Sequence, residues 1–284
     1  MQQNSIDSLD NFSALAVGAR LPATVLALFT LLAMPVFCDA DAIHQIPLQI
    51  EKKEPRDKRI FTQGFVVDDD TFFVSSGLYN QSFIQRYPRA APDKRENLSI
   101  PRQYFAEGLT IMGDSLYLIT WKAGIAWRFN KETLQLLNTY RYSGEGWGLT
   151  HNGTELITSD GSHILTFREP QSFTPIKSIS VTQNGSNVSE LNELEYHDGI
   201  IWANQWRSHI IYGIDSDTGK VIAELNGEAL LKEEGFYNRS GNRSSQNVLN
   251  GIAYDAYHDA FWVTGKRWQY RYLVKLPLPP TKTD

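Results

Sequence analysis

A short phrase recurs along this chain, each time at the start of a segment with strand-like composition. Its five copies are Gln63-Gly64-Phe65, Glu107-Gly108-Leu109, Trp147-Gly148-Leu149, Glu193-Leu194-Glu195 and Asn250-Gly251-Ile252. The glycines at 64, 108 and 148 are 44 and then 40 residues apart, and periods of about 40–45 residues are typical of propeller blades. The residue before the glycine changes from copy to copy. Because a purely structural repeat has little reason to vary there, we interpret these positions as the functional centre.

Beyond residue 40, the chain consists of short runs rich in β-branched and aromatic residues, separated by turns. Ser115–Thr120 is one such run, preceded by the turn Met112-Gly113-Asp114. Each repeat has room for about four strands. This pattern predicts an all-β fold, a five-bladed β-propeller with four-stranded antiparallel blades. A β-sandwich fits less well, because nothing in that fold repeats five times. The only helix we expect is a short one over residues 227–234.

The last repeat, residues 250–276, has only three strand-like runs. Residues 43–50, which precede the first repeat, alternate like a lone strand. An open ring would leave a sheet edge exposed. We therefore expect this N-terminal strand to supply the missing outer strand and to close the ring.

The N-terminus has the features of a secretory leader. Residues 21–37 carry no charge, and the small residues Cys38 and Ala40 suit a cleavage site. These features predict a signal peptide at 1–40 and a single β-propeller catalytic domain at 41–284. The mature chain would then have no cysteine, because Cys38 is the only one.

A signal anchor is the alternative for this segment. The stretch before Arg20 is long for a signal peptide. However, the apolar run is near the lower limit for crossing a bilayer and Pro35 interrupts its end, so we favour cleavage. We accordingly predict a secreted protein, or one in the lumen of the secretory pathway. No contact with a membrane is expected after cleavage.

Glycosylation motifs support the secretory prediction. Seven positions beyond the expected cleavage site match N-x-[ST] and are candidates for N-glycosylation: Asn80, Asn97, Asn152, Asn184, Asn187, Asn238 and Asn242. The net charge of -5 argues against nucleic acid as a partner, because a phosphate-binding protein would carry a basic patch. We expect a monomer.

Ten motifs, in this order along the chain, resemble the plant and bacterial type of glutaminyl-peptide cyclotransferase. They are Phe61–Phe65, Ser76–Tyr79, Phe105–Thr110, Thr120–Lys122, Gly146–Thr150, Ser159–Ser162, Leu191–Glu195, Trp202–Trp206, Leu249–Ala253 and Val263–Lys266. The resemblance covers about residues 45–276. It implies a five-bladed propeller. It also implies conversion of N-terminal glutamine in peptides and proteins to pyroglutamate, with release of ammonia.

The chemistry implied by this resemblance needs few catalytic groups. The free α-amine attacks the γ-carboxamide carbon of its own residue and closes a five-membered lactam. One carboxyl group can take a proton from the attacking amine and return it to the leaving nitrogen. By resemblance that general acid/base is Glu107. The structural alternative is a glutamate that accepts hydrogen bonds from backbone amides at the start of a blade.

The resemblance also implies a set of substrate-binding residues: Phe61, Gln63, Trp121, Trp147, Asn192, Trp206 and Lys266. The tryptophans would form an aromatic wall that excludes water from the site. Gln63 and Asn192 would hydrogen-bond the amide or the α-amine of the substrate, and Phe61 would line the pocket beside Gln63. Lys266 would stabilise the developing oxyanion or hold Glu107 ionised. A lysine at the surface end of a strand is its structural alternative.

Other residues invite a functional role that we disfavour. Glu193 and Glu195 could form a second acid/base pair or a metal site, but hydrogen bonds between blades are the better explanation. Trp202 and Trp262 lie inside strand-like runs, where ordinary core packing is expected. The six histidines show no ligand spacing such as H-E-x-x-H. We therefore expect a reaction without metal or other cofactor.

Two other functions are compatible with a secreted propeller. The first is a non-catalytic protein that binds peptide N-termini or glycans, and the presence of Glu107 argues against it. The second is a hydrolase of the lactonase kind, which would need calcium ligands from Asp, Asn and Glu in the channel. Asp is scarce at the repeat positions that would face the channel.

Overall fold

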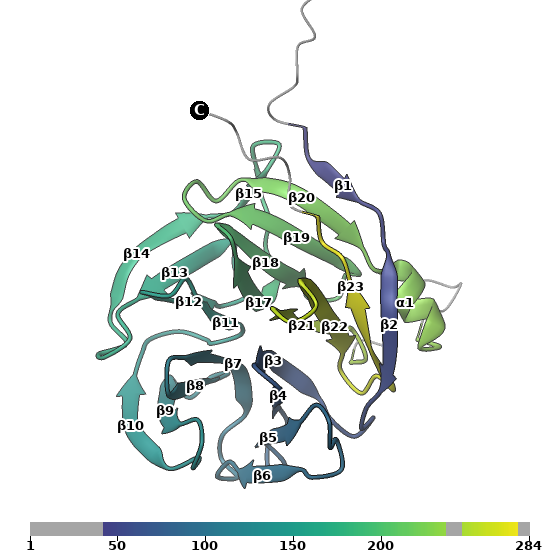
Figure 1. Cartoon of the computed structure of the whole chain (residues 1–284). Coiled ribbons are helices and arrows are strands. Elements are labelled where there is room, and N and C mark those ends of the chain that lie inside the picture. The colour runs from purple at the N-terminus through teal and green to yellow at the C-terminus, as the bar shows by residue number, and fades with distance from the viewer. Residues whose placement is uncertain (1–41, 237–245, 278–284) are drawn as a thin grey trace, which may run out of the picture. The chain divides into compact units, whose positions relative to one another are not determined.

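A computed structural model describes residues 42–236 and 246–277 of the chain (Figure 1). All of them belong to one compact unit, residues 40–284. The signal peptide predicted at 1–40 and the sequons at Asn238 and Asn242 lie outside the described residues. Over the described ranges, no helix has the length and apolar character needed to cross a membrane.

The described strands form five main sheets, which are the blades. Blade 1 consists of β3 (Thr62–Asp68), β4 (Thr71–Ser76), β5 (Phe83–Pro88) and β6 (Glu96–Ser99). Blade 2 consists of β7 (Ala106–Met112), β8 (Ser115–Thr120), β9 (Ile125–Asn130) and β10 (Leu136–Arg141). Blade 3 consists of β11 (Leu149–His151), β12 (Leu156–Ser159), β13 (Ile164–Arg168) and β14 (Pro175–Ser180). Blade 4 contains β17 (Leu191–His197), β18 (Ile200–Gln205), β19 (Ile210–Asp215) and β20 (Val221–Asn226). Blade 5 contains β21 (Leu249–Asp255), β22 (Ala260–Gly265) and β23 (Tyr270–Val274).

The blades form a closed ring (Figure 1). The first strand of each blade is the innermost, and each inner strand contacts the next in the order β3, β7, β11, β17 and β21. β21 also contacts β3, which completes the circle. Within each blade, consecutive strands pair antiparallel. The predicted five-bladed propeller is confirmed. Between blades 3 and 4, β15 (Thr182–Gln183) and β16 (Ser186–Asn187) add a small hairpin.

An N-terminal strand closes the ring, but it is not the segment that we predicted. β2 (Ile50–Pro55) pairs antiparallel with β23 and is the outer strand of blade 5, so only Ile50 of the predicted segment belongs to it. β1 (His44–Ile46), inside that segment, instead pairs parallel with β20 of blade 4. β2 is hard to predict from the sequence, because its residues are mostly charged and exposed and show no hydrophobic alternation.

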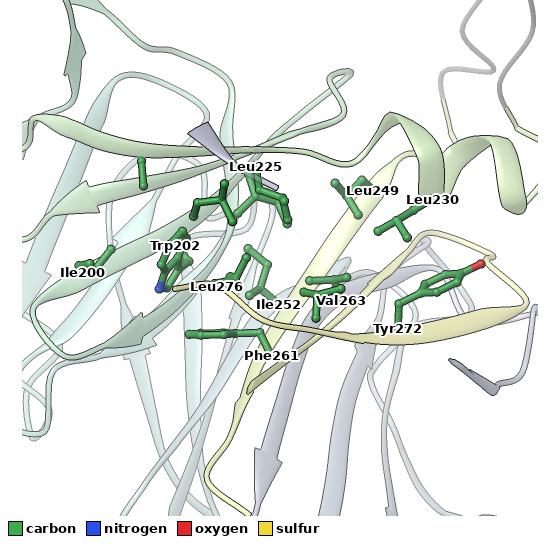
Figure 2. Packing of buried hydrophobic residues seen from close by; sticks show 14 of the residues in the cluster. Ile200, Trp202, Leu225, Leu230, Leu249, Ile252, Phe261, Val263, Tyr272 and Leu276 are labelled. Atoms are coloured by element: carbon green, nitrogen blue, oxygen red, sulfur yellow. The ribbon is translucent and has the colours of Figure 1, made fainter. Parts of the chain in front are cut away.

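The core lies between neighbouring blades. Figure 2 shows the cluster between blades 4 and 5, where Trp202 of β18 faces Phe261 of β22, with ring centroids 5.6 Å apart. Leu230, from helix α1 (Glu228–Glu233), covers one end of the cluster. Fully burying a side chain such as Leu, Ile, Val or Phe in this cluster contributes about 1.5–3 kcal/mol to stability. Trp202 and Trp262 are both fully buried, so their predicted place in the core is confirmed.

A β-bulge interrupts the inner strand where the repeated phrase begins. In blade 2, Ala106 pairs with Thr120 and Leu109 with Leu118, so that Glu107 and Gly108 together face a single residue, Ile119. A bulge bends a strand and re-aims the side chains beside it. It therefore turns the residue before the glycine away from the regular alternation of the strand.

The same register shift occurs in blade 4 and corrects our reading of the fourth copy of the phrase. Leu191 pairs with Gln205 and Leu194 with Ala203, so the bulged residues are Asn192 and Glu193. In blade 5 the bulged residues are Asn250 and Gly251. The fourth copy is thus Asn192-Glu193-Leu194, one residue earlier than predicted, and Glu193 takes the place of the glycine.

The repeated glycines are required where inner strands meet backbone to backbone. A Cβ atom on Gly108 would lie 2.4 Å from the backbone nitrogen of Leu149, and one on Gly148 would lie 1.9 Å from the backbone oxygen of Asn192. Neither position has room for a side chain. The phrase therefore marks the closest approach of blades around the channel.

Candidate active site

The predicted site residues gather at one end of the ring. Gln63, Glu107 and Asn192 stand at the beginning of their inner strands, and Trp147 directly precedes Gly148 at the equivalent place in blade 3. The second strand of each blade returns antiparallel to this same end. The residues that follow second strands are Trp121 after β8, Trp206 after β18 and Lys266 after β22. The antiparallel meander thus places residues from five blades around one mouth of the channel.

Glu107 is buried and held in a fixed orientation. The residue is only 6% exposed, and Gln63 Nε2 donates a hydrogen bond of 3.0 Å to its Oε1. Asn250 Nδ2 in turn donates to Gln63 Oε1 at 3.4 Å and to the backbone oxygen of Thr62 at 3.0 Å. These contacts orient the Gln63 amide with its nitrogen toward the carboxyl group. Asn250, which precedes the repeated glycine in blade 5 but was not among the predicted site residues, is the residue that orients Gln63.

Lys266 and Glu107 are a pair of buried ionisable groups. Burial raises the pKa of Glu107 well above its usual value, and the positive charge of Lys266 opposes that rise. Burial also lowers the pKa of Lys266 to about 8, opposed by the negative charge of Glu107. Lys266 is 5% exposed, and its Nζ lies 5.1 Å from the centre of the Phe61 ring. Burial thus shifts the pKa of each group toward its neutral form, while the opposite charge of its partner works against that shift.

Asn192 presents a buried acceptor to the site. Its residue is 2% exposed, and its Oδ1 has no hydrogen-bond partner among residues 42–236 and 246–277. Its backbone oxygen accepts a bond of 2.7 Å from Ser159 Oγ, which fixes the residue in place. A buried acceptor without a partner costs free energy, and a bound N–H group would remove that cost.

Buried and half-buried aromatic rings lie around the mouth. Trp147 and Trp206 meet edge to face, with centroids 5.4 Å apart and an interplanar angle of 88°. The ring of Phe105 packs against those of Trp121 and Phe61, with centroids 5.6 Å and 6.4 Å away. Phe105 was not among the predicted site residues. Its position directly before Ala106 and Glu107 in the sequence was the signal that could have found it.

Glu145 is a further residue that sequence reasoning missed. Its Oε2 accepts hydrogen bonds from Trp121 Nε1 at 2.7 Å and from Trp147 Nε1 at 2.9 Å. Its Oε1 lies 3.5 Å from Lys122 Nζ. Partial burial opposes ionisation, but the bonds from Trp147 and Trp121 and the charge of Lys122 together hold the pKa of Glu145 below its usual value.

Glu193 and Glu195 form hydrogen bonds between blades, as predicted. Glu193 accepts bonds from the backbone N–H of Phe65 in blade 1 at 3.1 Å and of Ile252 in blade 5 at 2.7 Å. Glu195 accepts one from the backbone N–H of Tyr254 at 2.8 Å. Burial raises the pKa of both carboxyl groups, to about 8 for Glu195. They tie blade 4 to its neighbour blade 5 and, across the ring, to blade 1.

The described ranges bring no three His, Cys, Asp or Glu side chains together in a way that could hold a metal ion. The metal-free reaction expected from the sequence stays a prediction. A pocket of about 620 Å³ opens where the inner strands end, lined by Glu195, Thr110 and Thr150 among others. It lies at the opposite end of these strands from Glu107, and none of the predicted substrate-binding residues lines it.

Together, the fold and the site define a five-bladed propeller with a buried carboxyl group and an aromatic-walled mouth at one end of its channel. Residues 23–276 match the model of the glutamine cyclotransferase family, and the chain belongs to that family. It is 32% identical over 246 residues to the glutaminyl-peptide cyclotransferase of Arabidopsis thaliana, covering 86% of this chain and 76% of the relative. The crystal structure of the glutaminyl cyclase of Myxococcus xanthus superposes with a TM-score of 0.74 at 33% identity, over 84% of this chain and 100% of that one.

Proposed function

We infer that this protein is a glutaminyl-peptide cyclotransferase. It converts the N-terminal glutamine of peptides and proteins to pyroglutamate and releases ammonia. Membership of the glutamine cyclotransferase family supports this function, as do two relatives named for the activity. The observation that carries the proposal within the site is the buried Glu107 carboxyl, oriented by Gln63 at the aromatic-walled mouth of the channel.

In the proposed mechanism, Glu107 moves one proton. The α-nitrogen attacks Cδ of the substrate glutamine and loses a proton to Glu107 as the new C–N bond forms. The bond between Cδ and the amide nitrogen then breaks, and Glu107 returns the proton so that this nitrogen leaves as ammonia. A carboxyl group whose pKa is raised by burial is suited to both steps, because it is a stronger base than an exposed carboxylate and can hold the proton until the amide nitrogen leaves. Gln63 holds Oε1, which leaves Oε2 for the substrate.

The surrounding residues would bind and polarise the substrate. The free Oδ1 of Asn192 is suited to accept a hydrogen bond from the α-amine. Gln63 would use the second N–H of its amide, which is not donated to Glu107, to hydrogen-bond the substrate amide. Lys266 is suited to stabilise negative charge on the amide oxygen and to favour the ionised form of Glu107. The rings of Trp121, Trp147 and Trp206 would pack on the methylene groups and exclude water, and Phe61 would line the same pocket.

We also propose that the protein is secreted, as a monomer that carries N-linked glycans. The apolar segment of residues 21–37 and the seven sequons support this route. Asn80, Asn97, Asn184 and Asn187 are exposed, where a glycan is readily accommodated. Asn152 is half-buried, and its amide is already bonded to Glu155 and Thr154.

The test is ammonia release from a peptide that begins with glutamine, compared with a peptide that carries glutamine only at an internal position. We expect ammonia from the first peptide alone, with the mass of pyroglutamate at its N-terminus. Binding of the first peptide without ammonia would indicate a non-catalytic receptor for N-termini instead. A chelator should leave the rate intact, and inhibition reversed by zinc would contradict the metal-free mechanism.

A further inference from the structure

One carboxylate connects two walls of the site. Trp121 follows the second strand of blade 2, while Trp147 stands at the start of blade 3. The indole N–H groups of both rings donate to the same atom, Oε2 of Glu145, at 2.7 Å and 2.9 Å. A single side chain thus fixes the relative position of two rings that come from different blades.

The bond matters because an indole has only one polar group, its N–H. Edge-to-face packing limits where a ring lies, but it leaves rotation about the side-chain bonds open. Trp121 packs on Phe105 at 5.6 Å, and Trp147 packs on Trp206 at 5.4 Å. A hydrogen bond to an ionised acceptor, which is stronger than a neutral one, removes the remaining freedom of each ring.

Glu145 also keeps a negative charge at the mouth. Its side chain is 38% exposed, and Lys122 Nζ lies 3.5 Å from its second oxygen. Its pKa lies below the usual value, despite partial burial, because of the bonds from Trp147 and Trp121 and the charge of Lys122. Its charge contributes to the raised pKa of Glu107, after burial and against the effect of Lys266.

We propose that Glu145 is a positioning residue for the cyclisation reaction, which holds the indoles of Trp121 and Trp147 as the walls against which the glutamine side chain folds back. This role rests on the proposed function of the site. Folding the side chain back is the main requirement of an intramolecular attack, since both reacting groups belong to one residue. A ring that turns out of place admits water and unproductive substrate conformers.

The first test measures the indole bonds directly. Protein with ¹⁵N-labelled tryptophan gives one indole resonance per ring, and Trp121→Phe and Trp147→Phe assign the two that concern Glu145. We expect Glu145→Ala to shift both upfield, because the hydrogen bond is lost. The resonance of Trp262, which bonds to Asp255, should stay unchanged. Unmoved resonances of both rings would refute the positioning role.

The second test separates geometry from charge. Glu145→Ala should raise KM for a glutamine-initiated peptide about tenfold, which corresponds to about 1.4 kcal/mol, with a smaller change in kcat. Glu145→Gln keeps an acceptor oxygen, so its KM should stay within about twofold of the wild type. Because the charge of Glu145 raises the pKa of Glu107, both variants should move the acid limb of the kcat profile to lower pH.

Controls distinguish failure of the positioning role of Glu145 from failure of the proposed function. Glu132→Gln removes an exposed charge in the turn after β9, at the far end of the strands from the site, and should change nothing. Wild-type KM in Glu145→Ala, or an equal rise in KM in both Glu145 variants, would overturn the positioning role. A wild-type protein that releases no ammonia would refute the proposed function, while the indole resonances would still decide whether Glu145 holds the two rings.

Discussion

Replacing Glu107 with glutamine removes the proton-transferring group and disturbs little else. Glutamine has nearly the same shape, and its Oε1 can still accept the bond that Gln63 Nε2 donates at 3.0 Å. The buried carboxyl is disfavoured in its ionised form, so a neutral amide relieves a desolvation cost. We therefore expect thermal unfolding to stay unchanged or to shift slightly upward. The pKa of Lys266 should fall further below about 8, because the charge that raises it is gone.

The expected loss of activity is large. General acid–base catalysis contributes about 10²–10⁴-fold, which is about 2.7–5.5 kcal/mol of activation free energy. Binding by the aromatic walls would persist, and so would the proximity of amine and amide within one residue. KM should therefore change much less than kcat. Glu107→Asp keeps the carboxyl group but shortens its reach, so we expect an intermediate rate.

The assay is continuous ammonia release from a glutamine-initiated dipeptide, with thermal unfolding measured on the same samples. Glu132→Gln, in the exposed turn after β9, is the control for loss of one carboxylate. A Glu107→Gln protein that folds normally and keeps more than about a tenth of wild-type kcat would refute the role of Glu107, since that loss is below the range for acid–base catalysis.

Three further predictions follow from the charges and the packing. Lys266→Met removes the charge that lowers the pKa of Glu107, so the acid limb of the kcat profile should move to higher pH, and a limb that stays in place would exclude this role. The pKa of Glu195 is raised by burial from 4.5 to about 8, so the folded state keeps a proton that the unfolded state loses. The free energy of unfolding should therefore fall as pH rises between these values. Glu195→Gln should flatten that slope by up to about 1.4 kcal/mol per pH unit in urea titrations, and an unchanged slope would contradict the shift. Gly148→Ala places a Cβ 1.9 Å from the backbone oxygen of Asn192 and should cost about 1–3 kcal/mol, or roughly 2–12 °C in Tm for a unit of this size, whereas an unaltered Tm would show that the strands can separate at little cost.

The blades were predictable because each has the same local signals. Alternating hydrophobic residues, short turns and a period of about 40–45 residues are properties of consecutive residues. The closing strand was placed wrongly for the opposite reason. β2 is an exposed outer strand with the sequence Ile50-Glu51-Lys52-Lys53-Glu54-Pro55, and only its pairing with β23 makes it part of a sheet.

The site was predictable where it coincides with the repeat. Gln63, Glu107 and Trp147 were found from the residue before the glycine. The fourth copy was read one residue late, because Glu193 replaces the glycine and the register of the bulge is visible only in the pairing of β17 with β18. Asn192 therefore takes the same place as Glu107 in its own blade.

Residues outside the repeat could not be found in this way. Glu145 follows no periodic pattern, and its role arises from two indole groups that belong to different blades. The link from Asn250 through Gln63 to Glu107 joins residues that do belong to the repeat, but their contact across three blades is equally absent from the pattern. Nothing in the neighbouring sequence of any of them encodes these contacts.

The sequence by itself determined the repeating unit, the number of blades and the chemical groups offered at the start of each inner strand. These depend on local propensity and on spacing along the chain, which can be read without coordinates. The tertiary structure alone decided which groups meet, how deeply they are buried and therefore where they titrate. Closing the ring brings Glu107 and Lys266 together, 159 residues apart (266 − 107) in the sequence, in a place with little water. Burial and charge pairing are properties of that assembled channel mouth, and no single blade has them.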